Sequence, residues 1–291
     1  MNDQAQSLRE KFHKGTDHSL SSKKTKVITV TSGKGGVGKS NFSLNFALGL
    51  IERGQKVVVI DLDVGFANID VLMGISSQKN ITQMIDNNLT IWDIIELGPK
   101  GLEFIAGGTG LSHMIEFNEQ KLNYFFEQLA LLNGYADTII LDTGAGISKE
   151  TLRFILSADE VILVTTPEPT SITDAYAVVK MTQSHKPNIR FNVVVNRAAS
   201  YKEGKSTGAK LALVAKQFLG LELVSLGCVY DDVHVSKAVR KQEPFFLSYP
   251  TSKAAESIRS LVSSYLSRKT QQGDDIGIKG FISRLRQLWK S

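Results

Sequence analysis

Residues 31–40 read TSGKGGVGKS, and this short stretch decides the fold of the chain. It contains the pattern G-x-x-x-x-G-K-[ST] at residues 33–40, directly after an apolar run and directly before a helix-like segment. In that context glycines allow backbone N–H groups to turn towards phosphate oxygens, and a helix N-terminus adds partial positive charge. We therefore expect a phosphate-binding loop; a glycine-rich turn without a ligand is the alternative.

Each residue of the loop has an expected role. Lys39 would reach the β- and γ-phosphates of a nucleotide, and the Ser40 hydroxyl would be a ligand of Mg²⁺. The backbone around the phosphates would come from the rest of the loop, namely Gly33, Gly35, Gly36, Val37 and Gly38. The pattern thus predicts a Mg²⁺-dependent nucleotide site.

A second lysine, Lys34, stands five residues before Lys39, and the general motif does not require it. A cation held at that position can point away from its own nucleotide, towards a phosphate bound by a second subunit. A solvated surface lysine is the alternative. The run KGGVGKS resembles the deviant Walker A loop of the MinD/ParA family of ATPases. This resemblance implies a homodimer in which each Lys34 acts as a catalytic residue on the ATP of the other subunit.

Two further segments place carboxylates after apolar runs. Asp61 and Asp63 follow VVVI, and Asp142 follows IIL. Because ligands of parallel sheets bind at the carboxyl ends of the strands, we expect these side chains near the phosphates. A carboxylate there can position the attacking water or bind Mg²⁺ through water. A strand-end cap is the alternative for each carboxylate taken singly.

The segments VVVIDLDVGFANIDVLMG and IILDTGAG resemble the switch I and switch II regions of the same family. The resemblance implies that Asp63 is the catalytic residue that positions water. It makes Asp61 a supporting catalytic residue and a metal ligand, and Asp142 a metal ligand. MinD proteins more often have Ser-Pro where Thr143 and Gly144 stand here, which leaves the contacts of switch II open.

The identity of the base follows from an absence. In VVVNRAAS, Asn196 ends an apolar run, but position 199 is alanine, so no carboxylate can pair with guanine there. We therefore expect adenine. The family resemblance implies that Asn196 contacts the base, that Arg197 stacks on it or flanks it, and that Asp231 and Asp232 close over it. An asparagine with a purely structural role in a turn is the alternative.

The middle of the chain predicts an α/β fold, with a doubly wound, mostly parallel sheet and helices on both faces. Short Val/Ile-rich runs typical of buried strands occupy residues 26–32, 56–63, 101–108, 137–146, 159–167 and 189–196. Helical periodicity appears between them, at residues 41–53, 118–132, 172–184 and 210–218. The polar stretch YKEGKSTGAK, residues 201–210, reads as a solvated loop or as part of a docking surface.

Charge gathers at the two ends of the chain. The 291 residues carry a net charge of +5, with +3 in residues 1–26 and +4 in residues 268–291, so the middle is net negative. We therefore expect no nucleic-acid partner for the folded domain. The single cysteine and the absence of a long apolar run predict a cytoplasmic setting. We divide the chain into a peptide with linker (1–25), an ATPase domain (26–267), a linker (268–275) and a helix (276–291).

The last segment, IGIKGFISRLRQLWKS, is predicted to form an amphipathic helix. Its bulky apolar residues fall within an arc of about 120°, and they are Ile278, Phe281, Ile282, Leu285, Leu288 and Trp289. The opposite face carries basic charge, which suits an anionic membrane surface, and two such helices in a dimer would bind firmly. MinD proteins end in a similar helix. The alternative is a helix docked on its own core, or one docked in the monomer and released in the dimer.

The first segment carries DQAQSLR at residues 3–9, which by itself predicts an unstructured tail. Ahead of a MinD-like domain it resembles the corresponding peptide of the FlhG family (also called YlxH or FleN), regulators of flagellar number and placement. The resemblance implies that Gln4, Leu8 and Arg9 contact the GTPase FlhF and stimulate it.

The resulting hypothesis is a slow ATPase that dimerises around ATP, binds the inner face of the cell membrane reversibly, and is reset by hydrolysis to ADP and phosphate. Its implied partners are FlhF and the flagellar switch (C-ring) proteins. A ParA-type DNA segregation ATPase and a MinD-type division-site ATPase are the nearest alternatives. A metal-cluster carrier would need paired cysteines, a small-molecule kinase would not use Lys34, and a scaffold that binds nucleotide without hydrolysing it remains open.

Overall fold

A computed structural model describes residues 24–63, 69–108, 119–186, 189–269 and 276–290. Within these ranges the strands form one sheet of eight, in the order β3-β4-β2-β5-β1-β6-β7-β8, and only β3 runs antiparallel to its neighbour. The strands are β1 (Lys26–Thr31), β2 (Val57–Leu62), β3 (Glu96–Leu97), β4 (Glu103–Ile105), β5 (Thr138–Thr143), β6 (Glu160–Thr165), β7 (Phe191–Ala198) and β8 (Val224–Tyr230).

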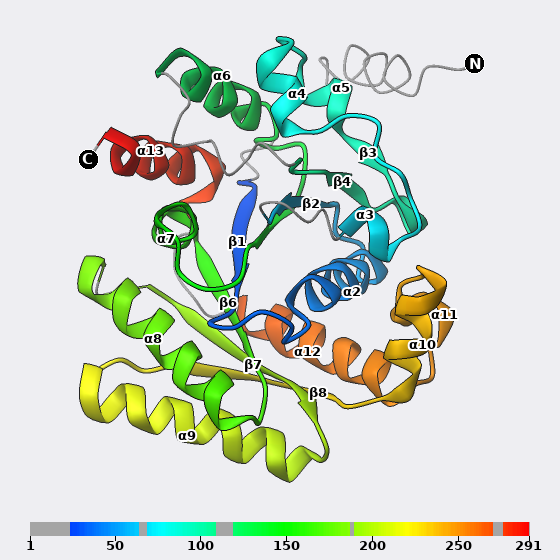
Figure 1. Ribbon diagram of the computed structural model, residues 1–291, viewed down its shortest axis with the longest axis vertical. Coiled ribbons are helices and arrows are strands. Elements are labelled where there is room, and N and C mark those ends of the chain that lie inside the picture. Colours follow the sequence, from blue (N-terminus) through cyan, green and yellow to red (C-terminus); the bar gives the residue numbers. More distant parts are fainter. Residues whose placement is uncertain (1–23, 64–68, 109–118, 187–188, 270–275, 291) are drawn as a thin grey trace.

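Helices cover both faces of this sheet (Figure 1). One face carries α2 (Lys39–Glu52), α3 (Ile69–Leu72), α10 (Val233–Lys241), α11 (Phe245–Ser248) and α12 (Lys253–Lys269). The other carries α4 (Ile81–Asp86), α5 (Ile91–Ile94), α6 (Glu119–Ala130), α7 (Lys149–Ser157), α8 (Pro169–His185), α9 (Tyr201–Leu219) and α13 (Gly277–Lys290). A short 3-10 turn, η1 (Pro99–Gly101), precedes β4. The predicted doubly wound, mostly parallel sheet is confirmed.

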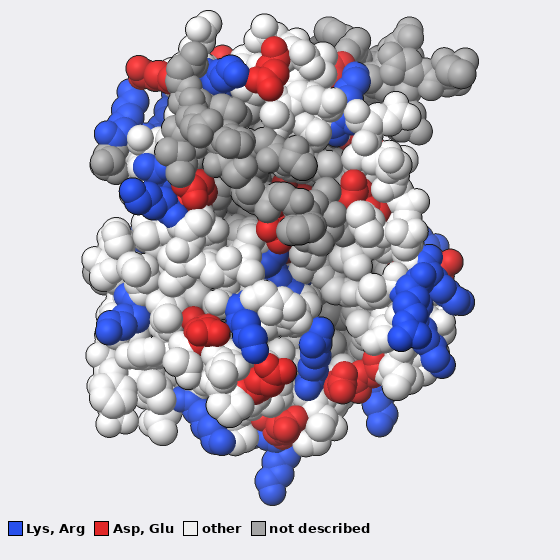
Figure 2. All heavy atoms as spheres, in the orientation of Figure 1, with Lys and Arg blue, Asp and Glu red and all other residues white. Residues whose placement is uncertain are grey.

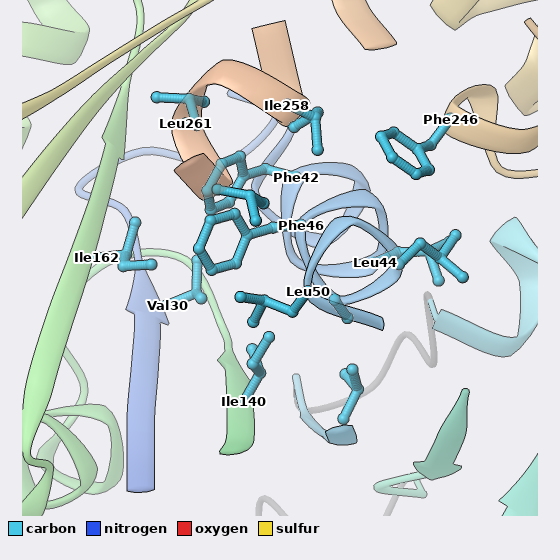
Figure 3. Close-up of a cluster of buried hydrophobic side chains, with 14 of the residues drawn as sticks. Val30, Phe42, Leu44, Phe46, Leu50, Ile140, Ile162, Phe246, Ile258 and Leu261 are labelled. Atoms are coloured by element: carbon cyan, nitrogen blue, oxygen red, sulfur yellow. The ribbon is translucent and has the colours of Figure 1, made fainter. Parts of the chain in front are cut away.

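The central strands are buried on both faces, which explains their unbroken Val/Ile runs. Side chains on the two faces of β1 enter opposite layers: Val27 belongs to the cluster with α6 and α13, while Val30 belongs to the cluster with α2 and α12. Figure 3 shows the second layer, where Phe42 and Phe46 of α2 lie between the sheet and α12. The two rings stack with their centroids 5.2 Å apart. The helix that follows the loop is therefore anchored firmly beneath it.

Strand β8 has no counterpart among the predicted strands. It lies at the edge of the sheet, and its sequence VSLGCVY lacks a long apolar run. Gly227 adopts a φ of 144°, and the register with β7 shifts between Val193 and Val194. An edge strand with an irregularity carries a weak sequence pattern, since only part of it must be buried.

The prediction of a loop at residues 201–210 is wrong, because these residues form the first half of α9. Ser200 caps the helix by accepting a hydrogen bond from Glu203 N. A glycine in this helix allows close packing on the sheet: a Cβ on Gly204 would lie 2.5 Å from the Cβ of Cys228. Likewise α12 continues to Lys269, so residues 268 and 269 belong to a helix.

Helix α13 packs on the same core as the rest of the chain (Figure 1). Ile278, Phe281, Ile282 and Leu285 are at most 7% exposed, and Leu288 and Trp289 are partly buried against neighbouring clusters. The sequence predicted that this apolar face binds a membrane. In this structure the same face is turned towards α6 and α7. None of the helices in the described ranges combines the length and apolar composition that crossing a bilayer requires.

Polar contacts fix both ends of α13. Asp159 Oδ1 accepts hydrogen bonds from Ile276 N (2.8 Å) and Gly277 N (3.1 Å), just before and at the start of the helix. Arg153 of α7 donates from Nε to the Leu288 carbonyl (3.0 Å), and its guanidinium lies 4.6 Å from the centre of the Trp289 ring. The docking thus combines apolar burial with specific contacts.

Candidate nucleotide site

The loop of residues 32–38 joins β1 to α2 in the middle of the sheet. The register places Val30 of β1 opposite Asp142 of β5, and Asp142 opposite Asp61 of β2. Three adjacent strands therefore bring the loop and both carboxylates to one point at their carboxyl ends. This is the position at which open α/β sheets bind ligands.

The glycines of the loop are required by close contacts and by backbone conformation. A Cβ on Gly33 would lie 2.2 Å from the backbone carbon of Asp174 in α8. Gly38 has a φ of 87°, and a Cβ there would lie 2.4 Å from Nδ2 of Asn196. The loop is thus held between α8 and the end of β7, and a glycine-rich loop before a helix can present backbone N–H groups to an anion.

Lys39 lies at the base of the loop and is buried. Its Nζ is 3.2 Å from Asp142 Oδ1 and 3.4 Å from Ser40 Oγ. Ser43, one turn further along α2, donates a hydrogen bond of 2.7 Å to the same Asp142 oxygen. Lys39, Ser40 and Asp142, which the sequence assigned to one site, are therefore in contact.

The other oxygen of Asp142, Oδ2, is buried and has no hydrogen-bond partner within the described residues. An unsatisfied buried carboxylate oxygen is costly unless a ligand completes it. Mg²⁺ prefers carboxylate, hydroxyl and water oxygens, so Asp142 and the neighbouring Ser40 fit this ion. Ser40 and Asp142 are two of the three predicted metal ligands, and the third, Asp61, is considered next.

Asp61 has a different environment from Asp142. Its two oxygens accept hydrogen bonds from Asp63 N (2.9 Å) and Ile69 N (3.2 Å), which flank residues 64–68. These contacts favour a role in holding the two ends of switch I over a role as a metal ligand. Asp63 lies beside switch II, because a Cβ on Gly144 would be 3.2 Å from Asp63 Oδ1.

Switch II also contacts the loop directly. Gly146 N donates a hydrogen bond of 2.9 Å to the carbonyl of Ser32. Two residues later Ser148 caps α7, accepting a hydrogen bond from Thr151 N. The segment after Asp142 therefore links the nucleotide loop to α7, the helix on which α13 packs.

Lys34 lies on the rim of the loop, away from Asp142. Its side chain is 41% exposed, and its Nζ contacts Glu168 Oε2 (3.0 Å) and Thr170 Oγ1 (3.2 Å) near the start of α8. The two lysines of the loop thus occupy different places: Lys39 is buried under it, while Lys34 is at the surface.

A cavity of about 580 Å³ lies next to the loop, between the ends of β7 and β8 and the helices α2, α10 and α12. Gly38, Asn196, Arg197 and Asp231 line it, so the residues assigned to the base meet at one cavity. Arg197 adopts a φ of 55°, an uncommon conformation for a residue other than glycine. The volume is ample for a nucleoside.

The contacts of Asn196 also support the structural alternative. Its Nδ2 donates to the Val37 carbonyl (2.7 Å), and its Oδ1 accepts from Arg197 N (3.0 Å). Asn196 therefore braces the loop from the side of the cavity. Sequence reasoning missed the apolar walls, which are Phe42, Val229, Val235, Val239, Phe245 and Ile258. They come from five separate elements, and only the fold brings them together.

Asp232 lines the same cavity, but its carboxylate is engaged elsewhere. Burial alone would raise the pKa of Asp232, yet hydrogen bonds from His234 and from Ala254 N lower it. Asp232 Oδ1 accepts from His234 N (2.9 Å) and Oδ2 from Ala254 N (3.2 Å). It joins α10 to α12 and shapes the wall of the cavity.

The predicted partner residues Gln4, Leu8 and Arg9 lie outside the described residues.

Comparison with known proteins agrees with this geometry. Residues 23–266 match the family model described as ParA, NUBPL iron-transfer P-loop NTPase. The chain is 35% identical to the antiactivator FleN of Pseudomonas aeruginosa, over 90% of this chain and 93% of that protein. It is 36% identical to the flagellum site-determining protein YlxH of Helicobacter pylori, over 90% of each.

Solved structures give the same fold. The cell division ATPase MinD of Pyrococcus furiosus superimposes with a TM-score of 0.69 at 22% identity, covering 83% of this chain and 98% of that one. The septum site-determining protein MinD of Pyrococcus horikoshii, solved with Mg-ADP, gives 0.69 at 23% identity, covering 85% and 98%. The chain therefore belongs to the ParA/MinD family of P-loop ATPases, which use ATP and Mg²⁺, in the group that contains FleN and YlxH.

Proposed function

We propose that this chain is a switch that dimerises around ATP and that regulates the number and placement of flagella. The observation that carries the proposal is the position of Lys34, a cation on the rim of a complete phosphate-binding loop. Lys39, which contacts Asp142 beneath the loop, would serve the subunit's own phosphates. A surface cation next to that site is suited to the triphosphate of a facing subunit.

The contacts of Lys34 allow such an exchange. Its ion pair with Glu168 is exposed on both sides, and exposed pairs contribute only about 0.2–1 kcal/mol. A triphosphate in a closed interface offers more charge and less solvent screening. Lys34 would therefore leave Glu168 when a second subunit with bound ATP approaches.

Hydrolysis would use the residues at the ends of β1, β2 and β5. Ser40 and Asp142 would hold Mg²⁺, which offsets the charge that develops on the β- and γ-phosphates. Lys39 would turn from Asp142 to the phosphates, and Asp63 would orient the attacking water. Asp61 would keep Asp63 in place through its contact with the backbone. Because the facing Lys34 completes the site, a single subunit should turn over slowly.

A membrane role for α13 requires its release from the core. In the docked state its apolar residues are covered by α6 and α7, so the helix offers a membrane only its basic side. Switch II leads directly into α7. We infer that closure of the switches around ATP weakens the docking, and that two released helices hold the dimer on an anionic membrane. The protein would then move between the cytoplasm and the inner face of the membrane.

The flagellar role is supported by the names of the two relatives in the same group, FleN and YlxH. Within this proposal, Gln4, Leu8 and Arg9 stimulate an FlhF-type GTPase, and a surface of the domain contacts flagellar switch (C-ring) proteins. In Figure 2 acidic and basic side chains are interspersed over much of the face in view, with one group of basic side chains at its right edge. A role in DNA segregation has less support, because residues 27–267 together carry a net negative charge. The MinD proteins are more distant relatives, since this chain is only 27% identical to the septum site-determining protein MinD of Helicobacter pylori.

The decisive experiment combines light scattering with liposome pelleting. The full chain should be a dimer with a non-cleavable ATP analogue and a monomer with ADP, and only the dimer should pellet with anionic liposomes. A chain that stays monomeric with the analogue bound would overturn the switch. For the flagellar part, the GTPase rate of an FlhF-type protein should rise on addition of the chain, and Gln4→Ala should remove that effect.

A further inference from the structure

Ser43 is a buried serine in the second turn of α2 whose hydroxyl bonds outside its own helix. Ser157 and Ser257 show the usual arrangement, donating to the carbonyl four residues earlier, at 2.7 Å in both cases. Ser43 instead donates across to the end of β5, where its Oγ lies 2.7 Å from Asp142 Oδ1. The hydroxyl thus joins the helix after the loop to the carboxylate assigned to the metal.

The two oxygens of Asp142 are unequally engaged. Oδ1 receives both Lys39 Nζ (3.2 Å) and Ser43 Oγ (2.7 Å), while Oδ2 has no partner among the described residues. We propose that Ser43 is a positioning residue, which fixes the rotation of the Asp142 carboxylate so that Oδ2 faces the Mg²⁺ position. This inference rests on the proposed assignment of Asp142 to the metal.

The need for Ser43 is greatest when nucleotide is bound. Lys39 then turns towards the phosphates, and Ser43 is the remaining donor to Oδ1 among the described side chains. Without its hydroxyl, the carboxylate could rotate and keep Lys39 as a direct partner, in competition with the phosphates. Groups that orient metal ligands are typically worth about 10- to 100-fold in metal affinity. We expect Ser43→Ala to raise the Mg²⁺ concentration at half-saturation about tenfold.

The test measures binding rather than turnover. A fluorescent ADP analogue is titrated into the full chain at a series of Mg²⁺ concentrations and in EDTA, with Ser43→Ala, Ser43→Thr and Asp142→Asn compared. Ser157→Ala is the matched control, because it removes an equally buried serine hydroxyl from another helix. If Ser43→Ala does not fold, Ser43→Cys replaces it, since a thiol is a weaker donor.

The expected result is a raised Mg²⁺ requirement for Ser43→Ala and for Asp142→Asn, recovery in Ser43→Thr, and unchanged binding in EDTA. Weakened binding in EDTA by the same factor would overturn the inference, because it would mean a purely structural role. A shift in Asp142→Asn without one in Ser43→Ala would also overturn it, while leaving the proposed metal site intact. No shift in Asp142→Asn would overturn the metal assignment and the inference together.

Discussion

Lys34 and Glu168 form an exposed ion pair, 3.0 Å between Nζ and Oε2, on the rim of the nucleotide loop. Glu168 precedes the first residue of α8, and Thr170 in the first turn adds a second contact. The lysine that we assign to the partner's ATP is thus bound to its own subunit in the state described. Dimer formation must replace this pair with a stronger one.

The first prediction concerns Lys34→Ala. Nucleotide binding by the monomer should change by less than about twofold, because Lys39 and the loop backbone hold the phosphates. Dimers with a non-cleavable ATP analogue should be lost, as measured by light scattering. Lys216→Ala is the control, since Lys216 also forms an exposed ion pair, 2.9 Å from Glu222, away from the loop. Equal dimerisation in Lys34→Ala and in the control would contradict the assignment.

Much of this site could be predicted because it is encoded locally. The loop, Lys39 and Asp142 lie within or directly after apolar strands, and a parallel sheet brings such strand ends together whatever else the chain does. The walls of the base cavity could not be predicted in the same way. Phe42 and Phe245 are about two hundred positions apart in sequence, and each reads as an ordinary core residue.

The docked α13 shows a different limit of sequence reasoning. An apolar stripe opposite basic residues is compatible with a membrane and with a protein surface, because burial against either removes the same apolar area from water. What distinguishes them is a receiving surface, formed here by α6 and α7. Asp159 and Arg153, which fix the two ends of the helix, carry no recognisable pattern in the sequence.

The second prediction concerns Asp63→Ala. Turnover of ATP should fall by at least about a hundredfold, because positioning of the attacking water is lost, while ATP binding and dimerisation remain. Phosphate release and light scattering measure the two properties separately. Asp86→Ala, at an exposed ion pair with Lys121, is the control. If Asp63→Ala keeps its ATP turnover, another residue must position the attacking water.

The third prediction tests the docking of α13 from the receiving side. Arg153→Ala removes the hydrogen bond to the Leu288 carbonyl and the contact with the Trp289 ring, and leaves α13 itself unchanged. Docking should weaken by about 1–2 kcal/mol, roughly a tenfold shift towards release. More of the ADP-bound chain should then pellet with anionic liposomes.

Arg259→Ala is the matched control for Arg153→Ala. Arg259 also combines polar contacts with an aromatic ring, since its guanidinium lies 4.6 Å from the Phe246 ring, but it belongs to α12. The Arg259→Ala variant should leave liposome pelleting of the ADP-bound chain unchanged. Removal of residues 276–291 should abolish pelleting in every nucleotide state without slowing hydrolysis greatly. Pelleting by the truncated chain would refute the role of α13.

The fourth prediction uses the pH dependence of stability. Burial, together with the nearby Arg284 of α13 and Arg190, lowers the pKa of Lys186 from 10.5 to about 8, against the opposing effect of Asp159. Between pH 8 and 10.5 the unfolded chain therefore binds more protons than the folded chain at this side chain. Below pH 8 the buried ammonium of Lys186 therefore lowers the free energy of unfolding by its full amount. This penalty should shrink as pH rises from 8 to 10.5, and it should return as pH falls from 10.5 to 8.

The variant Lys186→Met isolates this contribution. At pH 7 the variant avoids the cost of burying a charged ammonium, which raises its stability relative to the parent chain. It also loses the hydrogen bond from Lys186 Nζ to the Leu156 carbonyl (2.9 Å), which offsets part of this gain. The stability difference between variant and parent should shift in favour of the parent as pH rises from 8 to 10. Urea unfolding at fixed pH values measures it. Because Arg284 contributes to the shift, Arg284→Ala should raise the pKa of Lys186 in the folded chain and so narrow the window from its lower edge. A difference that stays constant with pH would show that Lys186 keeps its ordinary pKa, and that the charges of α13 do not act on it.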